Sequence, residues 1–230
     1  MTNTVSLTLA FDVYGTLIDT HGVMSRLQSF IGDQAVPFSQ AWRDKQLEYS
    51  FRRALMQSYA DFSVCTRQAL DFTCTLFQVD FTQEQKATLL SDYRTLPAFA
   101  DVENSLTQLQ QVGHRLYAFS NGSTEAVETL LQTAGIRELF LDVVSADDIC
   151  SFKPNPAVYE HFLSESQAAA NDAWLISSNP FDVLGAMNTD MNAAWVQRSP
   201  AALFDPWDVE PTMTITSLSE LQHLLELQRL

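Results

Sequence analysis

The hydrophobic positions along the chain follow two different patterns, and the change between them divides the sequence. Near the N-terminus, an apolar run from Leu7 to Phe11 stops at Asp12, and a Tyr-Gly-Thr turn follows it. An apolar run of this length, bounded by a glycine turn, is typical of a buried strand in a parallel sheet. From residue 23 to about 96 the apolar positions instead have helical spacing, and no strand is clear.

The helical segment is expected to contain three helices. The first opens at Pro37, and the third begins with a capping box formed by Thr82 and Gln85. The second helix is expected to have one apolar face, which consists of Cys65, Ala69, Phe72 and Leu76.

After Pro97 the pattern changes to helices that alternate with short apolar runs. Strands are expected at 115–119, 141–145, 173–176, 193–196 and 213–215. Strands that alternate with helices imply a parallel sheet with right-handed crossovers. We therefore predict an α/β fold with a doubly wound, Rossmann-like core domain. The core is expected to comprise residues 1–18 and 99–230, with a helical cap domain, residues 19–98, inserted between them.

Polar side chains follow three of the predicted strands, at the point where each strand ends. Asp12 follows the first, Ser120-Asn121 follows the second, and Ser177-Ser178-Asn179 follows a later one. Taken alone, Asp12 is as typical of a turn or helix cap as of a working carboxylate. Because the carboxyl ends of parallel strands share one edge of a sheet, where ligands bind, the convergence favours a functional site built around Asp12.

Composition narrows the classes of function. With 230 residues, of which 46% are hydrophobic, the chain can bury a full core, and its formal net charge is −15. Such a charge repels nucleic acids and anionic membranes, so any anion site must use a few local cations or backbone amides. No signal peptide and no apolar segment of membrane-spanning length is evident, which predicts a cytoplasmic protein.

The cysteines and histidines suggest no further chemistry. The cysteines have no metal-type spacing and are expected to be reduced and buried: they are Cys65, Cys74 and Cys150. The histidines are scattered and are interpreted as surface or core-edge residues: they are His21, His114, His161 and His223. His21 lies near the first motif, so a minor role at the site stays open for it.

Four short motifs occur in a fixed order along the chain. They are Asp12-Val13-Tyr14-Gly15-Thr16, Ser120-Asn121-Gly122, Lys153-Pro154 and Ser177-Ser178-Asn179-x-x-Asp182. In this order they resemble the motifs of the haloacid dehalogenase superfamily, most closely its (S)-2-haloacid dehalogenase branch. The segment from Trp42 to Tyr49 also resembles the insertion helix of that branch. The resemblance spans nearly the whole chain, and it implies the same core with an inserted cap.

Two positions distinguish the chain from the phosphatases of the superfamily. Those enzymes place a second aspartate two residues after the first, as a general acid and base, where this chain has Tyr14. They also carry an acidic pair near the last motif that helps to hold Mg²⁺, which prefers oxygen ligands. Here Ser178 and Asn179 occupy that region, and Asp182 is its only acid. Because a halide leaving group needs neither a proton nor a metal, we expect no metal and no cofactor.

The resemblance implies hydrolysis of short (S)-2-haloalkanoic acids to (R)-2-hydroxy acids by covalent catalysis. Asp12 would displace the halide with inversion, and water would then hydrolyse the resulting ester. Lys153 would neutralise the crowded carboxylates, the alternative being a solvated surface lysine. Asp182 would orient or deprotonate the water or anchor Lys153, the alternative being a helix N-cap. Thr16 is expected either to hydrogen-bond Asp12 or only to stabilise the turn.

The resemblance also implies how the substrate is held. Ser120 and Asn121, with backbone amides that enter the following helix, would bind the substrate carboxylate. Arg43, Asn121 and Phe181 would surround the departing halide, and the insertion would act as a lid. Without the family, Asn121 and Phe181 are more typical of an ordinary turn and of the edge of a core.

Further site residues carry similar alternatives. Ser177 and Asn179 would hold the nucleophile and the water, or only end a loop. Asp44 follows Arg43 where the branch usually has glutamine, and its carboxylate would either weaken anion capture or face solvent. The predicted pocket wall, each member of which also suits core or cap packing, consists of Tyr14, Leu47, Phe62 and Tyr159.

The expected partners are a small 2-haloacid substrate and, by resemblance, a second copy of the chain bound through the cap. Three other functions remain open on the sequence. The first is a related hydrolase that acts on fluoroacetate or on a strained ring such as azetidine-2-carboxylate. The second is a Mg²⁺-dependent phosphatase, and the third is a non-catalytic domain that binds carboxylates or a protein.

Overall fold

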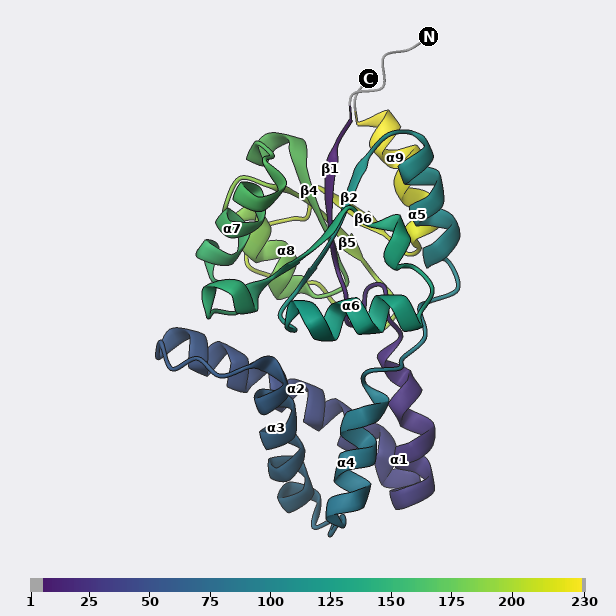
Figure 1. Ribbon diagram of the computed structural model, residues 1–230, viewed down its shortest axis with the longest axis vertical. Helices are drawn as coiled ribbons and strands as arrows, with labels where there is room; N and C mark the ends of the chain where they lie inside the picture. Colours follow the sequence, from purple (N-terminus) through teal and green to yellow (C-terminus); the bar gives the residue numbers. More distant parts are fainter. Residues whose placement is uncertain (1–5, 229–230) are drawn as a thin grey trace.

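A computed structural model of the chain describes residues 6–228. Within these residues the centre of the molecule is a parallel sheet of six strands in the order β3-β2-β1-β4-β5-β6, with β1 in the interior (Figure 1). The strands are β1 (Thr8–Asp12), β2 (Arg115–Ser120), β3 (Asp142–Ser145), β4 (Ala173–Ser177), β5 (Asn192–Val196) and β6 (Met213–Ile215). The predicted α/β fold with a doubly wound parallel sheet is confirmed.

Helices cover both faces of the sheet, because successive strand residues point to opposite sides. Leu9 and Phe11 of β1 belong to one apolar cluster, while Ala10 between them belongs to the other. The first cluster includes residues of α5 (Val102–Gln111), α6 (Thr124–Thr133) and α9 (Leu221–Leu227). The second includes residues of α7 (Pro156–Ser166) and α8 (Pro180–Met187). The strands are therefore buried on both sides, which explains their nearly continuous apolar sequences.

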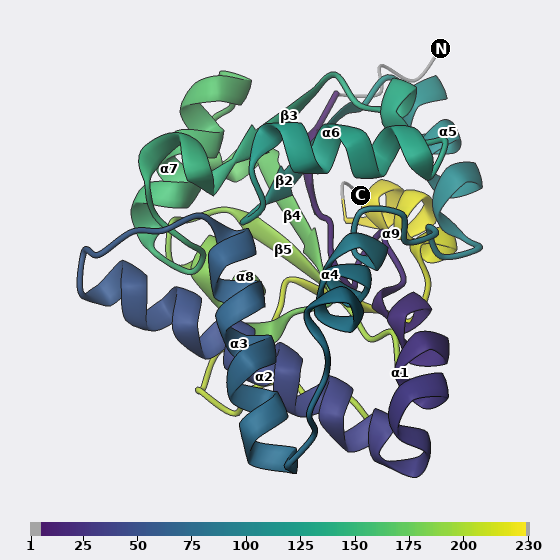
Figure 2. The same cartoon turned by 60° about the horizontal axis from the view of Figure 1, so that its bottom comes forward.

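A separate group of helices lies beyond the carboxyl edge of the sheet (Figures 1 and 2). It consists of α1 (Met24–Ile31), α2 (Ala35–Leu55), α3 (Phe62–Phe77) and α4 (Gln83–Asp92). We call these four helices the cap. Its interior contains edge-to-face pairs of aromatic rings, such as Phe38 with Trp42 and Trp42 with Tyr93. The indole N–H of Trp42 donates to the carbonyl of Thr66 at 2.8 Å and joins α2 to α3.

The two chain segments that join the cap to the sheet run side by side. The amide of Asp19 donates to the carbonyl of Pro97 at 2.8 Å, and that of Phe99 donates to the carbonyl of Leu17 at 2.9 Å. We retain 19–98 as the proposed cap domain and 1–18 with 99–230 as the proposed core. Residues 1–5 and 229–230 of that core lie outside the described residues.

The cap differs from the sequence-based expectations in two respects. A short helix, α1, precedes the three expected helices, and α2 begins at Ala35, two residues before Pro37, because proline fits the first turn of a helix. The buried face of α3 includes Thr66 and Thr73, whereas Phe72 and Leu76 are exposed. Each threonine hydroxyl donates to the carbonyl four residues earlier, so both hydroxyls have a hydrogen-bond partner on their own helix inside the cap.

One cysteine also departs from the expectation. Cys65 and Cys74 are buried free thiols, but Cys150 is exposed, and its left-handed conformation (φ 51°) ends a short helical turn. No helix within residues 6–228 combines the length and the apolar character that a membrane crossing would need.

Candidate active site

The carboxylate of Asp12 is the point at which distant parts of the chain meet. Asp12 ends β1 and is 8% exposed. Its Oδ2 accepts hydrogen bonds from Thr16 Oγ1 and from Asn179 Nδ2, each at 2.8 Å, and its Oδ1 lies 3.3 Å from Lys153 Nζ. These three donors come from the turn after β1, the end of β4 and the loop before α7. The convergence expected at this edge of the sheet is therefore present.

Lys153 is buried and has a partner for every proton of its ammonium group. Its side chain is 1% exposed, and Nζ donates to the carbonyl of Phe119 at 2.9 Å, to Asp182 Oδ2 at 2.9 Å and to Asp12 Oδ1 at 3.3 Å. Nζ also lies 4.0 Å from the centre of the Phe119 ring. The alternative of a solvated surface lysine is wrong, because the ammonium sits between two carboxylates inside the protein.

Asp182 is wholly buried near the start of α8. Its Oδ2 accepts from Lys153, and its Oδ1 accepts from the hydroxyl of Tyr159 at 2.7 Å. Burial raises the pKa of Asp182, and the ammonium of Lys153 opposes that rise. The cap residue of α8 is Asn179, so the N-cap alternative for Asp182 is wrong. Among the roles expected for Asp182, the contacts favour anchoring Lys153.

Tyr159 is not a pocket wall residue, which corrects the expectation. It is 0% exposed and packs in the second apolar cluster, against Phe119 and beside Gly185. A methyl group on Gly185 would overlap the phenol ring, so the ring can pack here only because residue 185 has no side chain. Burial and the neighbouring carboxylate of Asp182 raise the pKa of Tyr159 well above 10, so the hydroxyl keeps its proton and donates. Tyr159 therefore positions Asp182.

Arg43 connects the cap to the nucleophile. It extends from α2, and its Nη2 donates to Asn179 Oδ1 at 3.0 Å and lies 3.5 Å from the carbonyl oxygen of Tyr14. Because Asn179 Nδ2 donates to Asp12, the amide links the guanidinium to the carboxylate. Asp44 points elsewhere: it is exposed and accepts from Gln40 on its own helix at 2.9 Å. Of the two possibilities for Asp44, the structure favours the one that faces solvent.

The other predicted binding residues make contacts that shape the loops. Ser120 Oγ accepts from the amide of Gly122 at 3.1 Å, and Ser177 Oγ accepts from the amide of Asn179 at 3.1 Å. Asn121 Oδ1 accepts from the backbone amide of Lys153 at 2.9 Å. Phe181 packs edge-to-face on Phe51 of α2, with ring centres 5.0 Å apart. These contacts fit the structural alternatives, and the roles in binding remain proposals.

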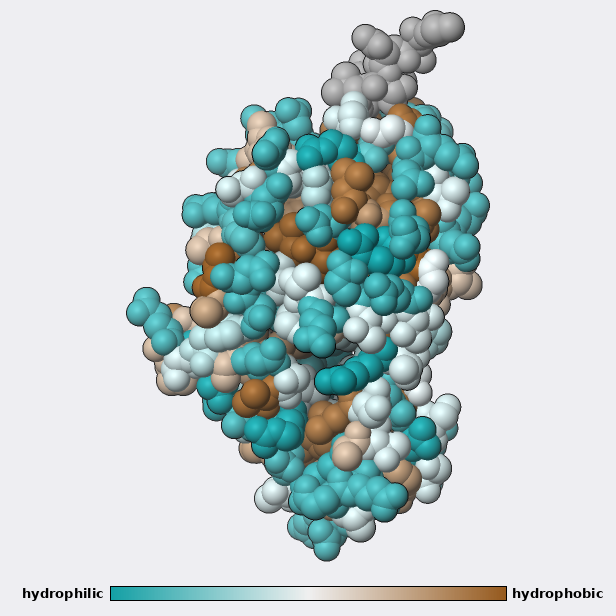
Figure 3. Space-filling model, in the orientation of Figure 1, coloured by the Kyte–Doolittle hydropathy of each residue, from teal (hydrophilic) through white to brown (hydrophobic). Residues whose placement is uncertain are grey.

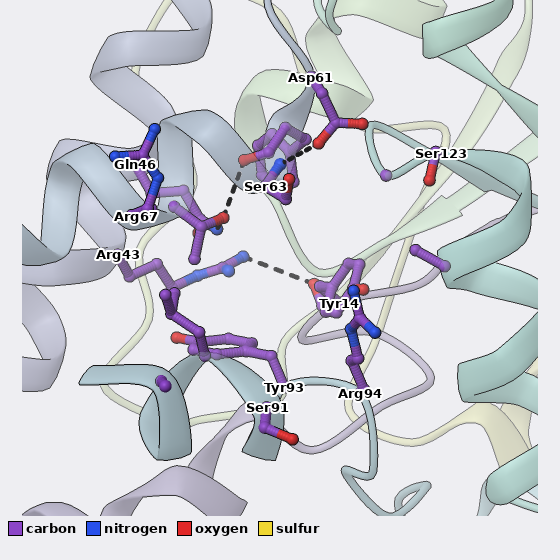
Figure 4. Close-up of a pocket in the computed structure, with 16 residues that line it drawn as sticks. Tyr14, Arg43, Gln46, Asp61, Ser63, Arg67, Ser91, Tyr93, Arg94 and Ser123 are labelled. Carbon is purple, nitrogen blue, oxygen red and sulfur yellow. Dashed lines mark hydrogen bonds between the residues drawn. The ribbon is translucent and has the colours of Figure 1, made fainter. Parts of the chain in front are cut away.

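A cavity of about 490 Å³ separates the cap from the core, and Figure 3 shows the surface hollowed between the two. Tyr14 and Phe62 line it as expected, together with Arg43 (Figure 4). Leu47 is not among the lining residues, because its neighbour Gln46 turns toward the cavity and one residue rotates the side chain by about 100° around a helix. Lining residues that the sequence did not suggest include Gln46, Asp61, Ser63, Arg67, Tyr93, Arg94 and Ser123.

Comparison with known proteins places this arrangement in a family. A model of haloacid dehalogenase-like hydrolases matches residues 7–188. The chain belongs to the haloacid dehalogenase-like hydrolases. The (S)-2-haloacid dehalogenase of Pseudomonas sp. (strain YL) is 34% identical over 220 residues, 95% of this chain and 94% of that protein. The predicted family and branch are confirmed.

Two further relatives extend this family assignment. Haloacetate dehalogenase H-2 of Moraxella sp. (strain B) is 33% identical over 217 residues, 94% of this chain and 96% of that protein. The L-2-haloacid dehalogenase of Xanthobacter autotrophicus, solved with chloropropionic acid covalently bound, is 27% identical with a TM-score of 0.89. That match covers 96% of this chain and 99% of the solved one.

In this haloacid dehalogenase-like hydrolase, Ser178 and Arg198 stabilise the turn after Asp12. The sequence did not predict this role for either residue. The amide of Ser178 donates to Thr16 Oγ1 at 2.8 Å, which directs the single hydroxyl proton of Thr16 toward Asp12. Arg198 Nη2 donates to the carbonyl of Thr16 at 2.7 Å, and Asp101 pairs with the same guanidinium. No local signal reveals these partners, because they lie far away along the chain.

In this haloacid dehalogenase-like hydrolase, the hydroxyl of Tyr159 donates to the buried carboxylate of Asp182, which also accepts from Lys153. Replacing Tyr159 by phenylalanine is expected to lower the free energy of unfolding by about 1 to 3 kcal/mol, because Asp182 Oδ1 loses its donor inside the core. Urea unfolding followed by tryptophan fluorescence measures this change. Tyr49→Phe is the matched control, because its hydroxyl makes no hydrogen bond within residues 6–228. Equal stability of the two variants would contradict the positioning role.

Proposed function

We propose that this chain is a hydrolytic (S)-2-haloacid dehalogenase that converts short 2-haloalkanoic acids into 2-hydroxy acids. The observation that supports this most directly is the Asp12 carboxylate, held by Thr16 and Asn179 on one oxygen and facing Lys153 with the other. The names and the covalently bound chloropropionic acid of its relatives agree with a covalent aspartyl mechanism. This is also the activity expected from the sequence.

In the first step, Asp12 attacks the α-carbon of the substrate. Oδ2 uses its lone pairs on the donors Thr16 and Asn179, whereas Oδ1 has one long contact to Lys153, so Oδ1 is the nucleophile. The Oδ1–carbon bond forms while the carbon–halogen bond breaks from the opposite face, which inverts the (S) centre. The halide leaves with the bonding electron pair, and no proton is needed.

In the second step, water attacks the ester carbon of Asp12. The carbonyl oxygen is then Oδ2, and the hydroxyl of Thr16 and the amide of Asn179 already point at it. Donors that are in place before charge develops stabilise an oxyanion efficiently. The bond to Oδ1 breaks, Oδ1 leaves as the hydroxyl oxygen of the product, and the water oxygen remains in Asp12. One water proton ends on the product, and the other is released to solvent.

The substrate is proposed to lie between the cap and the carboxyl edge of the sheet. Ser120, Asn121 and the backbone amides after β2 are proposed to hold its carboxylate. Arg43, with Asn121 and Phe181, is proposed to receive the halide. Arg43 already reaches from the cap to the loop that holds Asp12, which supports this assignment.

Halide release from (S)- and (R)-2-chloropropionate, each measured with and without EDTA, tests the proposal. Release from the (S) form alone, unaffected by EDTA, is expected. Among residues 6–228 no group of three or more His, Cys, Asp and Glu side chains is arranged to hold a metal ion. Release from neither acid, together with turnover of fluoroacetate, azetidine-2-carboxylate or a phosphate ester with Mg²⁺, would replace the proposal by that activity. Tight binding of the haloacid without turnover would indicate a non-catalytic domain.

Replacing Asn179 by alanine is expected to slow hydrolysis of the ester more than its formation. The amide donates to Oδ2, which becomes the oxyanion, and loss of one such donor typically lowers a rate by about 10²- to 10³-fold. Mass spectrometry after mixing with (S)-2-chloropropionate should then reveal the protein with Asp12 alkylated as the ester. Asn188→Ala, an exposed amide at the other end of α8, is the matched control. No accumulation beyond that control would contradict the assignment of Oδ2.

A homodimer formed through the cap is the proposed assembly. Several large apolar side chains of α2, α3 and the residue after α2 are exposed: they are Val36, Leu55, Met56, Phe72 and Leu76. An interface that covers α2 and α3 would remove these apolar side chains from water. Light scattering of the purified chain is expected to give twice the mass of 25.8 kDa, and Leu55→Asp is expected to give the monomer. A monomeric parent protein at micromolar concentration would contradict this proposal.

The cytoplasm is the proposed location. The thiols Cys65, Cys74 and Cys150 are all free, which agrees with a reducing compartment. Fractionation of cells with an antibody against the chain tests this, and recovery outside the cytoplasm would contradict it.

A further inference from the structure

Two arginines at the cavity between cap and core have no counter-charge. Within residues 6–228, every lysine and arginine has a side-chain hydrogen bond or ion pair except Arg67 and Arg94. Both of these line the cavity, and both side chains are exposed to solvent. The chain carries 28 acidic residues against 13 lysines and arginines, so partners for a surface cation are plentiful. Two unpaired guanidiniums at one cavity therefore indicate a site for an anion.

The two arginines reach the same cavity from different parts of the cap. Arg67 extends from α3, and Arg94 lies just after α4; Figure 4 shows Arg94 beside Tyr14 and Arg67 beside Gln46, with Arg43 between them. Burial raises the pKa of Tyr14 to about 12, and the charge of Arg94 opposes that rise, which agrees with their proximity.

The charge of the cavity wall also favours an anion. Asp61 is the only carboxylate among the described residues that line the cavity, and its Oδ1 already accepts from the amide of Ser63 at 2.6 Å. Three guanidiniums therefore face one carboxylate, so the wall is cationic in a protein whose net charge is −15.

The proposed reaction of a simple haloalkanoate does not use these two charges. Its single carboxylate is assigned to Ser120 and the amides after β2, and its halide is assigned to Arg43. The cavity, at about 490 Å³, also falls in the range of pockets that hold much larger ligands than a three-carbon acid. Arg67 and Arg94 both belong to the cap side of this cavity.

We propose that the preferred substrate is a 2-halodicarboxylic acid, whose second carboxylate binds Arg94 and Arg67. This inference rests on the proposed function, because the halogen-bearing carbon must still reach Asp12. Guanidinium groups suit the task, because they bind carboxylates through two parallel hydrogen bonds and are less strongly hydrated than an ammonium. The distal carboxylate would enter from solvent on the cap side, while the α-carboxylate is held at the sheet edge.

The test compares two acids of equal chain length, (S)-2-chlorobutanedioate and (S)-2-chlorobutanoate, which differ only in a carboxylate for a methyl group. The parent protein is expected to show a kcat/KM at least about tenfold higher for the diacid, since a hydrogen bond to a charged group contributes that much or more. The double variant Arg67→Gln with Arg94→Gln is expected to lose this preference and to keep its rate on the monoacid within about twofold. Arg52→Gln, an exposed arginine elsewhere on the cap, is the matched control and should change neither rate.

Each other outcome overturns a specific statement. Equal rates on the two acids in the parent protein, or an equal loss on both in the double variant, would overturn the diacid proposal alone. Halide release from neither acid would overturn the proposed dehalogenase function, and the diacid proposal with it. Melting temperatures of all variants separate a folding defect from a change in specificity, and each single arginine variant is measured beside the double one.

Discussion

Replacing Asp12 by asparagine is expected to lower kcat/KM for halide release by more than about 10⁴-fold, because the nucleophile itself is lost. The amide is nearly the same size as the carboxylate but carries no negative charge to displace a halide. The fold should persist, because Lys153 keeps Asp182 as a counter-charge. Halide release from (S)-2-chloropropionate measures the effect, with circular dichroism to verify folding.

The control and a second readout make this result specific to Asp12. Asp44→Asn removes an exposed carboxylate beside Arg43 and is expected to leave the rate nearly unchanged. A single turnover in water labelled with heavy oxygen should place the label in Asp12 and leave the product unlabelled, because Oδ1 departs with the product. Label in the product during the first turnover would instead indicate direct attack by water on the substrate.

Replacing Lys153 by methionine is expected to lower the free energy of unfolding by about 3 to 5 kcal/mol at neutral pH. The change leaves the carboxylates of Asp12 and Asp182 buried together without the ammonium that both contact. The same variant should release halide very slowly, because the anionic substrate would approach the carboxylates of Asp12 and Asp182 without the ammonium that balances their charge. Urea unfolding and halide release measure the two effects.

The stability deficit of this variant should depend on pH in a defined direction. Burial raises the pKa of Asp182, and loss of the opposing charge of Lys153 raises it further. A carboxyl group whose pKa is higher in the folded than in the unfolded protein stabilises the fold below the unfolded value. That stabilisation is lost as the pH rises through the folded value. The deficit is therefore expected to be smaller near about pH 5 than near about pH 8.

Lys86→Met is the matched control for this pH series. Its ammonium pairs with Asp71 at the surface of the cap at 2.6 Å, and surface pairs contribute at most about 1 kcal/mol. The control should therefore show a small deficit with no trend across the same pH range. A deficit for Lys153→Met no larger than that of the control, or one that grows as the pH falls, would contradict the buried charge balance.

The sequence by itself determined the sheet, the order of the motifs and the edge at which they meet. Apolar runs that end at Asp12, Ser120 and Ser177 predict parallel strands, and the ends of parallel strands share one edge. A strand has a period of two residues and a fixed direction, so a local pattern is enough to place its last side chain. That is why the neighbourhood of Asp12 could be predicted before its partners were seen.

Only the tertiary structure decided which side chains face the site from the helices. The direction of the side chain changes by about 100° from one helix residue to the next. An error of one residue in the predicted orientation of α2 therefore places Leu47 at the cavity instead of Gln46. Tyr159 moved from the expected pocket wall to the core because Gly185, on another helix, leaves space for its ring. Nothing in the sequence distinguishes Arg67 and Arg94 from the other arginines. Only the tertiary structure brings both, without an ion-pair partner among residues 6–228, to one cavity between the cap and the sheet.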